Sequence, residues 1–335
     1  PLPGSREPDL SYLESAAAEL SRVLAPGQLV VLESTTYPGT TRDLMRPALE
    51  AGSRTAGVDF HLAFSPERID PGRTDFTVRT TPKLVGGLTP ACTERAGALY
   101  GEICDAVVPL TGPEAAELSK LLENIFRSVN IALVNELAQL CDRLGVDVWE
   151  VIDAASTKPF GFMRFEPGPG MGGHCLPVDP FYLAFKAREH GFYPEFIELA
   201  GKVNQSQPLF CVNRIERALN ANGLPVNGTR ILIMGVSYKG GVGDTRESPA
   251  LRIIGLLAEL GAELSYHDPH VPELPASGLR GVGELGPALD AAQLTVIVTA
   301  HPGIDWGEVV ERSEHVLDLR GVTRDLGERP NLTRL

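Results

Sequence analysis

The chain has 335 residues, enough for two or three domains, and its 43% hydrophobic and 22% charged residues are ordinary for a globular protein. Its net charge of −13 argues against a nucleic-acid-binding protein, and no apolar run approaches the roughly 20 residues that cross a bilayer. We therefore expect neither a nucleic-acid nor a membrane partner. The five widely spaced cysteines contain no CxxC pair, so we expect no disulfide framework and no metal site, and we predict the cytoplasm.

The first third of the chain alternates helical and strand patterns. We predict a helix within residues 8–24 and buried strands within 27–35, 59–72 and 82–89. Such alternation is typical of a parallel α/β sheet, in which ligands bind beyond the carboxyl ends of the strands. Thr35, Thr36 and Glu67 follow the predicted strands and are therefore candidate ligand-binding residues.

One uninterrupted helix is predicted over residues 114–144, which contain no glycine or proline. A helix of this length, about 45 Å, is typical of a spine between domains or of a dimer core. Lys120 and Asn124 are four residues apart and share one face of it, where they can contact a substrate oxygen. Taken alone, this pair is better explained as a solvated charge beside a polar neighbour.

A second α/β module is predicted from residue 228 onward. Residues 228–269 fit strand, glycine-rich turn, helix and strand, and 295–302 and 315–321 add further strands. We predict an α/β fold with two Rossmann-like parallel-sheet domains, the first truncated, joined by a long central helix with a helical middle domain. The predicted domains are a first α/β domain at residues 1–112, a central helical domain at 113–222 and a C-terminal α/β domain at 223–335.

The segment PGPGMGGHCLPVDPFYL, residues 167–183, contains a Gly-x-Gly-x-x-Gly pattern. A dinucleotide fingerprint follows a strand and opens a helix, but prolines lie on both sides here, so we interpret the match as accidental. The glycines are better explained by close approach of the backbone to a ligand. Cys175 lies beside His174 and four residues before Asp179, which favours a nucleophile over a buried structural thiol.

Two shorter patterns carry weaker signals. Residues 267–270, HDPH, have the spacing of a metal site, but a turn after a strand explains them better. Arg246 in DTRES is placed at the start of a helix, where it can bind phosphate, or it is simply an exposed arginine beside an N-cap.

Together these segments resemble the UDP-glucose/GDP-mannose dehydrogenase family, the nucleotide-sugar 6-dehydrogenases, in order and over nearly the whole chain. The motifs that carry the resemblance are ESTTYPGTT, FSPERIDPG, ELSKLLEN, GPGMGGHCLPVDP, SYKGGVGDTRES and DLRG. The Gly-Gly-His-Cys form of the fourth motif looks most like family members that oxidise UDP-N-acetylhexosamines.

Two departures from the family pattern stand out. The family's first strand, its glycine turn and the following acidic residue have no counterpart in the printed residues, so we expect these residues alone to bind NAD weakly and to turn over little. The Pro-Glu motif of relatives that oxidise UDP-glucose carries a second glutamate where this chain has Pro71 beside Asp70. This difference weakens an assignment to UDP-glucose.

The resemblance implies a four-electron oxidation of a sugar C6 alcohol to a carboxylate with two NAD, through a thiohemiacetal and a thioester on Cys175. It places Lys120 and Asn124 around the reacting oxygen, and it has Asp179, Asn124 and Thr36 orient the hydrolytic water. Glu67 serves as a base or through a bridging water.

Domain and binding roles follow from the same resemblance. It makes residues 1–112 the remainder of an NAD-binding domain, 113–222 a central helical dimerisation domain with the nucleophile loop, and 223–335 a UDP-sugar-binding domain. The cofactor is NAD, contacted by Thr35, Thr36 and Arg246. The UDP-sugar is contacted by Glu67, Lys120, Asn124, Arg164, Gly172, Lys239 and Arg320. A homodimer through the central helix and a role in envelope polysaccharide precursors are also implied.

Three other functions stay open at this point. They are a UDP-glucose 6-dehydrogenase, a two-electron hydroxyacid dehydrogenase that has no use for Cys175, and a non-catalytic UDP-binding fragment.

Overall fold

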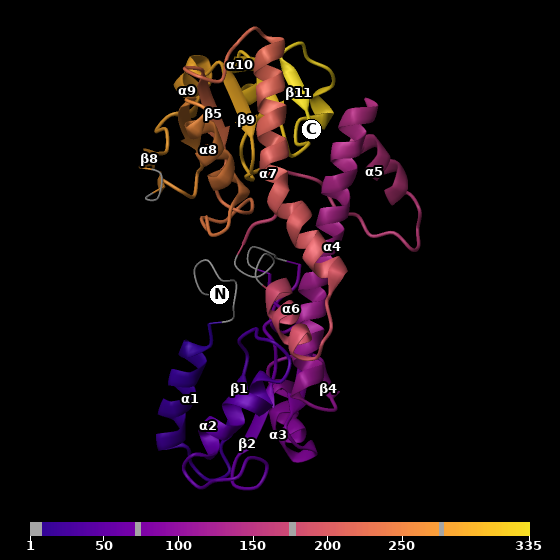
Figure 1. Cartoon of the computed structure of the whole chain (residues 1–335), viewed down its shortest axis with the longest axis vertical. Helices are drawn as coiled ribbons and strands as arrows, with labels where there is room; N and C mark the ends of the chain where they lie inside the picture. The colour runs from indigo at the N-terminus through magenta and orange to yellow at the C-terminus, as the bar shows by residue number, and fades with distance from the viewer. Residues whose placement is uncertain (1–8, 71–74, 174–178, 275–277) are drawn as a thin grey trace. The chain divides into compact units, whose positions relative to one another are not determined.

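The computed structural model describes residues 9–70, 75–173, 179–274 and 278–335 (Figure 1). The chain forms two compact units, one of Pro1–Phe126 with Val178–Glu198 and one of Arg127–Pro177 with Leu199–Leu335. The predicted central domain is thus divided between the two units, and its boundaries stay a prediction. Each unit is described by itself below.

The sheet of the first unit has four strands in the order β1-β2-β3-β4. They are β1 (Leu29–Leu32), β2 (His61–Phe64), β3 (Lys83–Gly87) and β4 (Val107–Leu110). The pairs β1/β2 and β3/β4 are parallel as predicted, but β2 pairs with β3 in the antiparallel sense. A parallel return needs a crossover, usually a helix, and the described part of the β2–β3 connection contains none.

Helices cover both faces of this sheet. They are α1 (Ser11–Val23), the π-helix Thr41–Met45 that continues into α2 (Arg46–Glu50), and α3 (Pro90–Gly101). Leu32 and Phe64 pack with α1 and α2, whereas Ala63 and Val85 pack against α3. Neighbouring strand residues therefore point to opposite faces, as the pleat of a strand requires.

Four helices lie between the two sheets in the chain. They are α4 (Pro113–Leu144), α5 (Val148–Ser156), α6 (Asp179–Glu189) and α7 (Glu195–Ala221). The bounds of α4 agree with the predicted helix to one residue, with Pro113 at the first helical position where its missing N–H costs nothing. Within the second unit, α4 and α7 run side by side (Figure 1) and are joined by side-chain hydrogen bonds and ion pairs.

The sheet of the second unit is entirely parallel, in the order β11-β10-β9-β5-β6. Its strands are β5 (Arg230–Met234), β6 (Glu263–His267), β9 (Leu294–Ile297), β10 (Val316–Asp318) and β11 (Leu332–Arg334). A small antiparallel pair, β7 (Glu273–Leu274) with β8 (Leu279–Arg280), lies outside the sheet order, and a 3-10 turn spans Arg324–Leu326. The chain adds β6 on one side of β5 and β9 on the other, so the order reverses between β5 and β9.

The core of this module lies on both faces of β5. Ile231 and Ile233 pack against α7 and α8 (Pro249–Glu259). Leu232 and Met234 pack against α9 (Leu285–Ala291) and α10 (Trp306–Arg312). All four side chains are fully buried. The fold class is therefore confirmed as α/β, with one mixed and one parallel sheet.

No helix within the described residues is long and apolar enough to cross a membrane.

Candidate active site

The predicted site residues fall in both units. Those of the first unit are Thr35, Thr36, Glu67, Lys120, Asn124 and Asp179, and those of the second are Arg164, Gly172, Lys239, Arg246 and Arg320. Cys175 and Pro71 lie outside the described residues, and of Asp179 only its place at the start of α6 is described. The site is therefore built here as two separate groups of residues.

Thr35 and Thr36 lie just beyond the carboxyl end of β1, where the sequence placed them. Thr36 is 3% exposed, and its Oγ1 has no hydrogen-bond partner within the described part of the chain. A buried hydroxyl left without a partner costs about 1–3 kcal/mol, so such an atom points to a ligand that satisfies it. Thr36 thus fits a place beside a cofactor or substrate.

A buried carboxylate that sequence reasoning missed holds the same loop. Glu117 on α4 is fully buried, and it accepts hydrogen bonds from the N–H of Gly39 (2.6 Å) and from both the N–H (2.9 Å) and the hydroxyl (2.7 Å) of Thr41. Burial raises the pKa of Glu117 against the opposing effect of these bonds. Glu117 precedes Lys120 by one helical turn, and this spacing was the available signal.

The Pro-Glu loop is also fastened to α4. Glu67 is exposed and accepts a hydrogen bond from the N–H of Ile69 (2.6 Å). Its neighbour Arg68 forms an ion pair of 2.7 Å with Glu123 on α4 and donates to the carbonyl of Pro82. Because Glu123 adjoins Asn124, this ion pair ties the loop of Glu67 to the Lys120–Asn124 segment. Asn124 is 3% exposed, so its amide is held in a defined place.

A second unpredicted cluster lies where β1 ends. Glu33 contacts Lys83 Nζ at 3.0 Å and accepts a hydrogen bond of 2.6 Å from the Tyr100 hydroxyl. Burial and the neighbouring Glu33 raise the pKa of Tyr100, so its hydroxyl is a firm donor. These contacts fix Glu33, the residue immediately before the Ser-Thr-Thr loop.

In the second unit, the glycine segment 167–173 lies directly on the C-terminal module. A Cβ atom on Gly172 would be 2.8 Å from Cβ of Tyr238, and one on Gly173 would be 3.1 Å from the Tyr238 ring. A Cβ on Gly168 would collide with the Arg320 guanidinium. The N–H of Gly173 donates to the carbonyl of Arg246 (3.2 Å). The glycines are thus needed for close packing, and the described residues before Gly168 form no strand as far back as α5.

The loop that carries Lys239 follows β5 at the point where the strand order reverses, the usual ligand position in an open parallel sheet. A buried network holds it. Asp268 accepts hydrogen bonds from the N–H of Val236 (2.8 Å) and of Ser237 (3.0 Å) and contacts His301 Nε2 at 2.9 Å. The N–H of Gly241 donates to His301 Nδ1 (3.2 Å), so Nε2 carries the proton and donates to Asp268.

The carboxyl of Asp268 is strongly perturbed. Burial alone raises its pKa, but hydrogen bonds from His301 and from three backbone N–H groups outweigh burial and lower the pKa to about 2. Asp268 is therefore ionised under ordinary conditions and works as a fixed acceptor. From the sequence, this segment is interpreted only as a turn in preference to a metal site. Among the described residues, no group of three or more His, Cys, Asp or Glu side chains is placed to hold a metal.

Two predicted arginines have partners within their own unit. Arg246 does not begin a helix, because α8 starts at Pro249 with Ser248 as its cap, and its guanidinium contacts Asp244 at 2.6 Å. Arg164 pairs with Asp153 at 2.6 Å and with Glu166 at 3.2 Å. Burial lowers the pKa of Arg320 against the opposing effect of the nearby carboxylates of Glu166 and Asp318.

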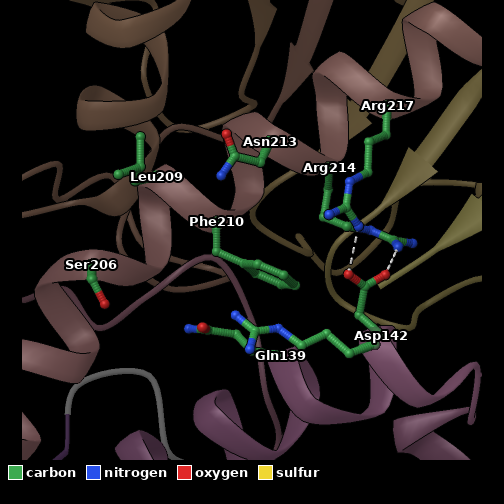
Figure 2. A pocket seen from close by; sticks show the side chains of 9 residues that line it. Gln139, Asp142, Ser206, Leu209, Phe210, Asn213, Arg214 and Arg217 are labelled. Atoms are coloured by element: carbon green, nitrogen blue, oxygen red, sulfur yellow. Dashed lines mark hydrogen bonds and ion pairs between the residues drawn. The ribbon is translucent and has the colours of Figure 1, made fainter.

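A pocket of about 240 Å³ opens between α4 and α7, away from these motifs (Figure 2). Figure 2 shows Asp142 on α4 facing Arg214 and Arg217 on α7, with which it forms ion pairs. The residues that line it include none of the predicted site residues. The pocket therefore belongs to the seam between the helices rather than to the candidate site.

Comparisons with known proteins define the class. The family models for the UDP-glucose/GDP-mannose dehydrogenase NAD binding domain, central domain and UDP binding domain match residues 1–104, 114–206 and 232–325. The fold and its domains are therefore those of an NAD-dependent nucleotide-sugar dehydrogenase, which confirms the expected enzyme class and NAD as its cofactor. The chain belongs to the UDP-glucose/GDP-mannose dehydrogenase family.

Several relatives are similar along most of their length. UDP-N-acetyl-D-mannosamine dehydrogenase of Pyrococcus horikoshii is 35% identical over 97% of this chain and 76% of its own. UDP-N-acetyl-D-glucosamine 6-dehydrogenase of Pseudomonas aeruginosa is 35% identical over 95% and 76%. The solved structure of the Pyrococcus horikoshii UDP-D-ManNAc dehydrogenase matches with a TM-score of 0.88 at 34% identity, covering 99% of this chain and 78% of that one.

Proposed function

We propose that this enzyme oxidises the C6 hydroxyl of a UDP-N-acetylhexosamine to the carboxylate, with Cys175 as the covalent nucleophile. The observation that carries the proposal is the packing of the glycine segment before Cys175 onto the Tyr238–Lys239 loop of the UDP binding domain. This packing supports a nucleophile that acts on a sugar anchored by its nucleotide.

The chemistry needs two oxidations and one hydrolysis. NAD, when bound, would supply the hydride acceptor for both oxidations. In the first, Lys120 and Asn124 stabilise the developing alkoxide and the hydroxyl proton leaves to water near Glu67. The Cys175 thiolate then adds to the aldehyde carbon to give a thiohemiacetal, and loss of the second hydride leaves a thioester. Water, oriented by Asp179, Asn124 and Thr36, hydrolyses the thioester and restores the thiol.

Substrate anchoring falls to the second unit. Lys239 and Arg320 are assigned to the UDP moiety, since the Lys239 loop lies at the switch point between β5 and β9 and the Arg320 guanidinium lies against Gly168. These local cations explain how a chain of net charge −13 binds an anionic nucleotide. Arg164, Gly172 and Arg246 keep their predicted binding roles, with Arg246 and Thr35 assigned to the cofactor.

The homodimer is proposed to form along α4. Six large apolar side chains on this helix are 45–65% exposed: Leu118, Leu122, Phe126, Leu133, Leu140 and Leu144. Their spacings are close to multiples of the helical repeat, so they form one stripe, and a second copy of the helix is the partner whose surface matches it. Cytoplasmic location and a role in envelope polysaccharide precursors stay predictions of the same proposal.

The sugar is proposed to be N-acetylated because the relatives named above act on UDP-N-acetylmannosamine or UDP-N-acetylglucosamine. An acetamido group carries an N–H and a carbonyl that a hydroxyl lacks. A site built for it leaves buried polar groups unpaired when UDP-glucose binds, at about 1–3 kcal/mol per group. We expect kcat/KM to favour the N-acetylhexosamine by about one to two orders of magnitude.

One set of kinetic measurements tests the proposal. The enzyme is assayed with NAD and, in turn, UDP-N-acetylglucosamine, UDP-N-acetylmannosamine and UDP-glucose, and both kcat/KM and the NADH formed per sugar are measured. We expect two NADH per sugar and a preference for an N-acetylhexosamine. One NADH per sugar would indicate a two-electron dehydrogenase, binding without turnover a UDP-binding fragment, and equal efficiency with UDP-glucose a UDP-glucose dehydrogenase.

A further inference from the structure

Two buried amide side chains hold a single residue of the glycine segment. The N–H of Gly168 donates to Asn135 Oδ1 at 3.0 Å, and Gln207 Nε2 donates to the carbonyl of Gly168 at 3.0 Å. Asn135 is on α4 and Gln207 on α7, and both are fully buried. The N–H and the carbonyl of Gly168 are therefore both hydrogen-bonded, one to a side chain of α4 and the other to a side chain of α7.

A second layer of bonds fixes which way each amide points. Asn135 Nδ2 donates to Asn204 Oδ1 (3.1 Å), and Asn204 Nδ2 donates to the carbonyl of Ser128 (3.0 Å). Gln139 Nε2 donates to Gln207 Oε1 (2.9 Å). Because Asn135 presents its oxygen and Gln207 its NH₂ group to Gly168, turning either amide over would oppose like groups.

The two bonds to Gly168 act on a stretch of chain without regular secondary structure. Residues 163–170 form no helix or strand, and Gly168 has no side chain to pack. Gly170 leans on α7 beside Pro208, whose missing N–H leaves the carbonyl of Asn204 without its helical donor. Satisfying a buried peptide explains one bond to each group, but a linked network of four amides also sets the register of the segment.

We propose that Asn135 and Gln207 are positioning residues that set the register of the loop ending in Cys175, seven residues after Gly168. Asn204 acts through Asn135 by locking its orientation. The inference rests on the proposed role of Cys175. Loss of the two hydrogen bonds to Gly168 should therefore slow the steps that use the thiol. It should weaken the binding of UDP less, because UDP binding depends on the Lys239 loop.

The sharpest variant is Gln207→Glu, which replaces the NH₂ group facing the Gly168 carbonyl by an oxygen and keeps the oxygen that accepts from Gln139. The ionised carboxylate repels that carbonyl, whereas the protonated acid donates to it as the amide did. Measured against the wild type at each pH, we expect Cys175 alkylation by iodoacetamide and kcat to fall at least tenfold at pH 8. The deficit should shrink as the pH is lowered, with UDP affinity within threefold throughout.

Alkylation under native conditions is suited to this test, because Cys92, Cys104, Cys141 and Cys211 are all buried. The matched control is Ser206→Ala, because Ser206 adjoins Gln207 on α7 and its exposed hydroxyl donates to the carbonyl of Val203 rather than to a residue of the network, so kcat should stay within threefold. Ser206 lines the pocket of Figure 2, whereas Gln207 does not.

A second pair covers the case in which Gln207→Glu does not fold. Asn135→Asp keeps the oxygen that accepts from Gly168, whereas Asn135→Leu removes it, so the aspartate variant should retain most of the alkylation rate that the leucine variant loses. Equal rates for the two, or a Gln207→Glu deficit that does not change with pH or that is no larger than the deficit of Ser206→Ala, would overturn the inference. Cys175→Ser separates the two proposals: undiminished acid formation by that variant would refute the role of Cys175 itself.

Discussion

The two sheets differ in how the polar groups at the carboxyl ends of their strands are hydrogen-bonded. In the second unit, Asp268, His301 and Ser237 satisfy one another and the backbone of the Lys239 loop. In the first unit, the Thr36 hydroxyl is buried without a partner in the described residues, and Glu67 is exposed. At the strand ends of the second unit, these polar groups have hydrogen-bond partners without a ligand. At those of the first unit, the Thr36 hydroxyl is a group that a ligand would satisfy.

This difference separates binding from chemistry. A preorganised loop loses little entropy when it takes up a nucleotide, which favours affinity. Groups whose interactions form only with the reacting atoms contribute to the transition state instead, which favours kcat. We therefore expect variants of the Thr36, Glu67 and Lys120 group to lower kcat, and variants of the Asp268 network to weaken nucleotide binding or stability.

The largest effect is expected at Lys120. In the proposed mechanism Lys120→Ala removes a charge beside the developing alkoxide, so kcat should fall about 10²–10³-fold while KM changes by less than about threefold. Steady-state kinetics check this split, with the exposed Lys158→Ala as the control. A rise in KM at constant kcat would assign Lys120 to ground-state binding. It would contradict the expectation that residues at the first sheet act on kcat rather than on binding.

The second effect concerns Asp268 and acid. Its pKa is about 2 in the folded protein against an ordinary value of 3.8, so the carboxylate contributes stability that is fully present above about pH 4 and lost as the pH falls towards 2. The contribution is at most about 2 kcal/mol. The Tm of Asp268→Asn should lie below that of the wild type at pH 6, and the gap should narrow by pH 3.

The exposed Asp325→Asn is the control for this measurement and should track the wild type at every pH. A gap between Asp268→Asn and the wild type that stays constant from pH 6 to pH 3 would show that Asp268 stabilises the loop without titrating.

How much of this the sequence predicts depends on the range of the signal. Helix α4 and both α/β modules follow from local periodicity and from turn residues, whereas the roles of the motif residues follow from the family resemblance and stay predictions. The antiparallel pairing of β2 with β3 does not, because it depends on how a long irregular connection returns. Glu117, Asn135 and Gln207 read as ordinary polar positions on amphipathic helices, and only their tertiary partners reveal what they hold. Arg246 shows the opposite error, since a plausible helix start lies three residues later.

The smallest effect, at Thr36, tests the comparison most directly. Thr36→Val removes a buried hydroxyl that has no partner in the described residues and replaces it with a methyl group of similar size. Removing an unsatisfied buried hydroxyl should leave the free energy of unfolding unchanged or raise it by about 1 kcal/mol, whereas loss of a ligand contact should lower kcat/KM about tenfold. Thr40 is the matched control, because it lies in the same loop, is fully buried, and donates its hydroxyl to the carbonyl of Tyr37 at 2.7 Å. Thr40→Val should therefore lose stability and keep its activity in the folded fraction, the reverse of Thr36→Val. Chemical unfolding and steady-state kinetics on the two variants decide the matter. If Thr36→Val and Thr40→Val lose the same stability and both stay active, the Thr36 hydroxyl has a structural partner. The polar groups at the strand ends of the first unit would then be satisfied without a ligand, as in the second.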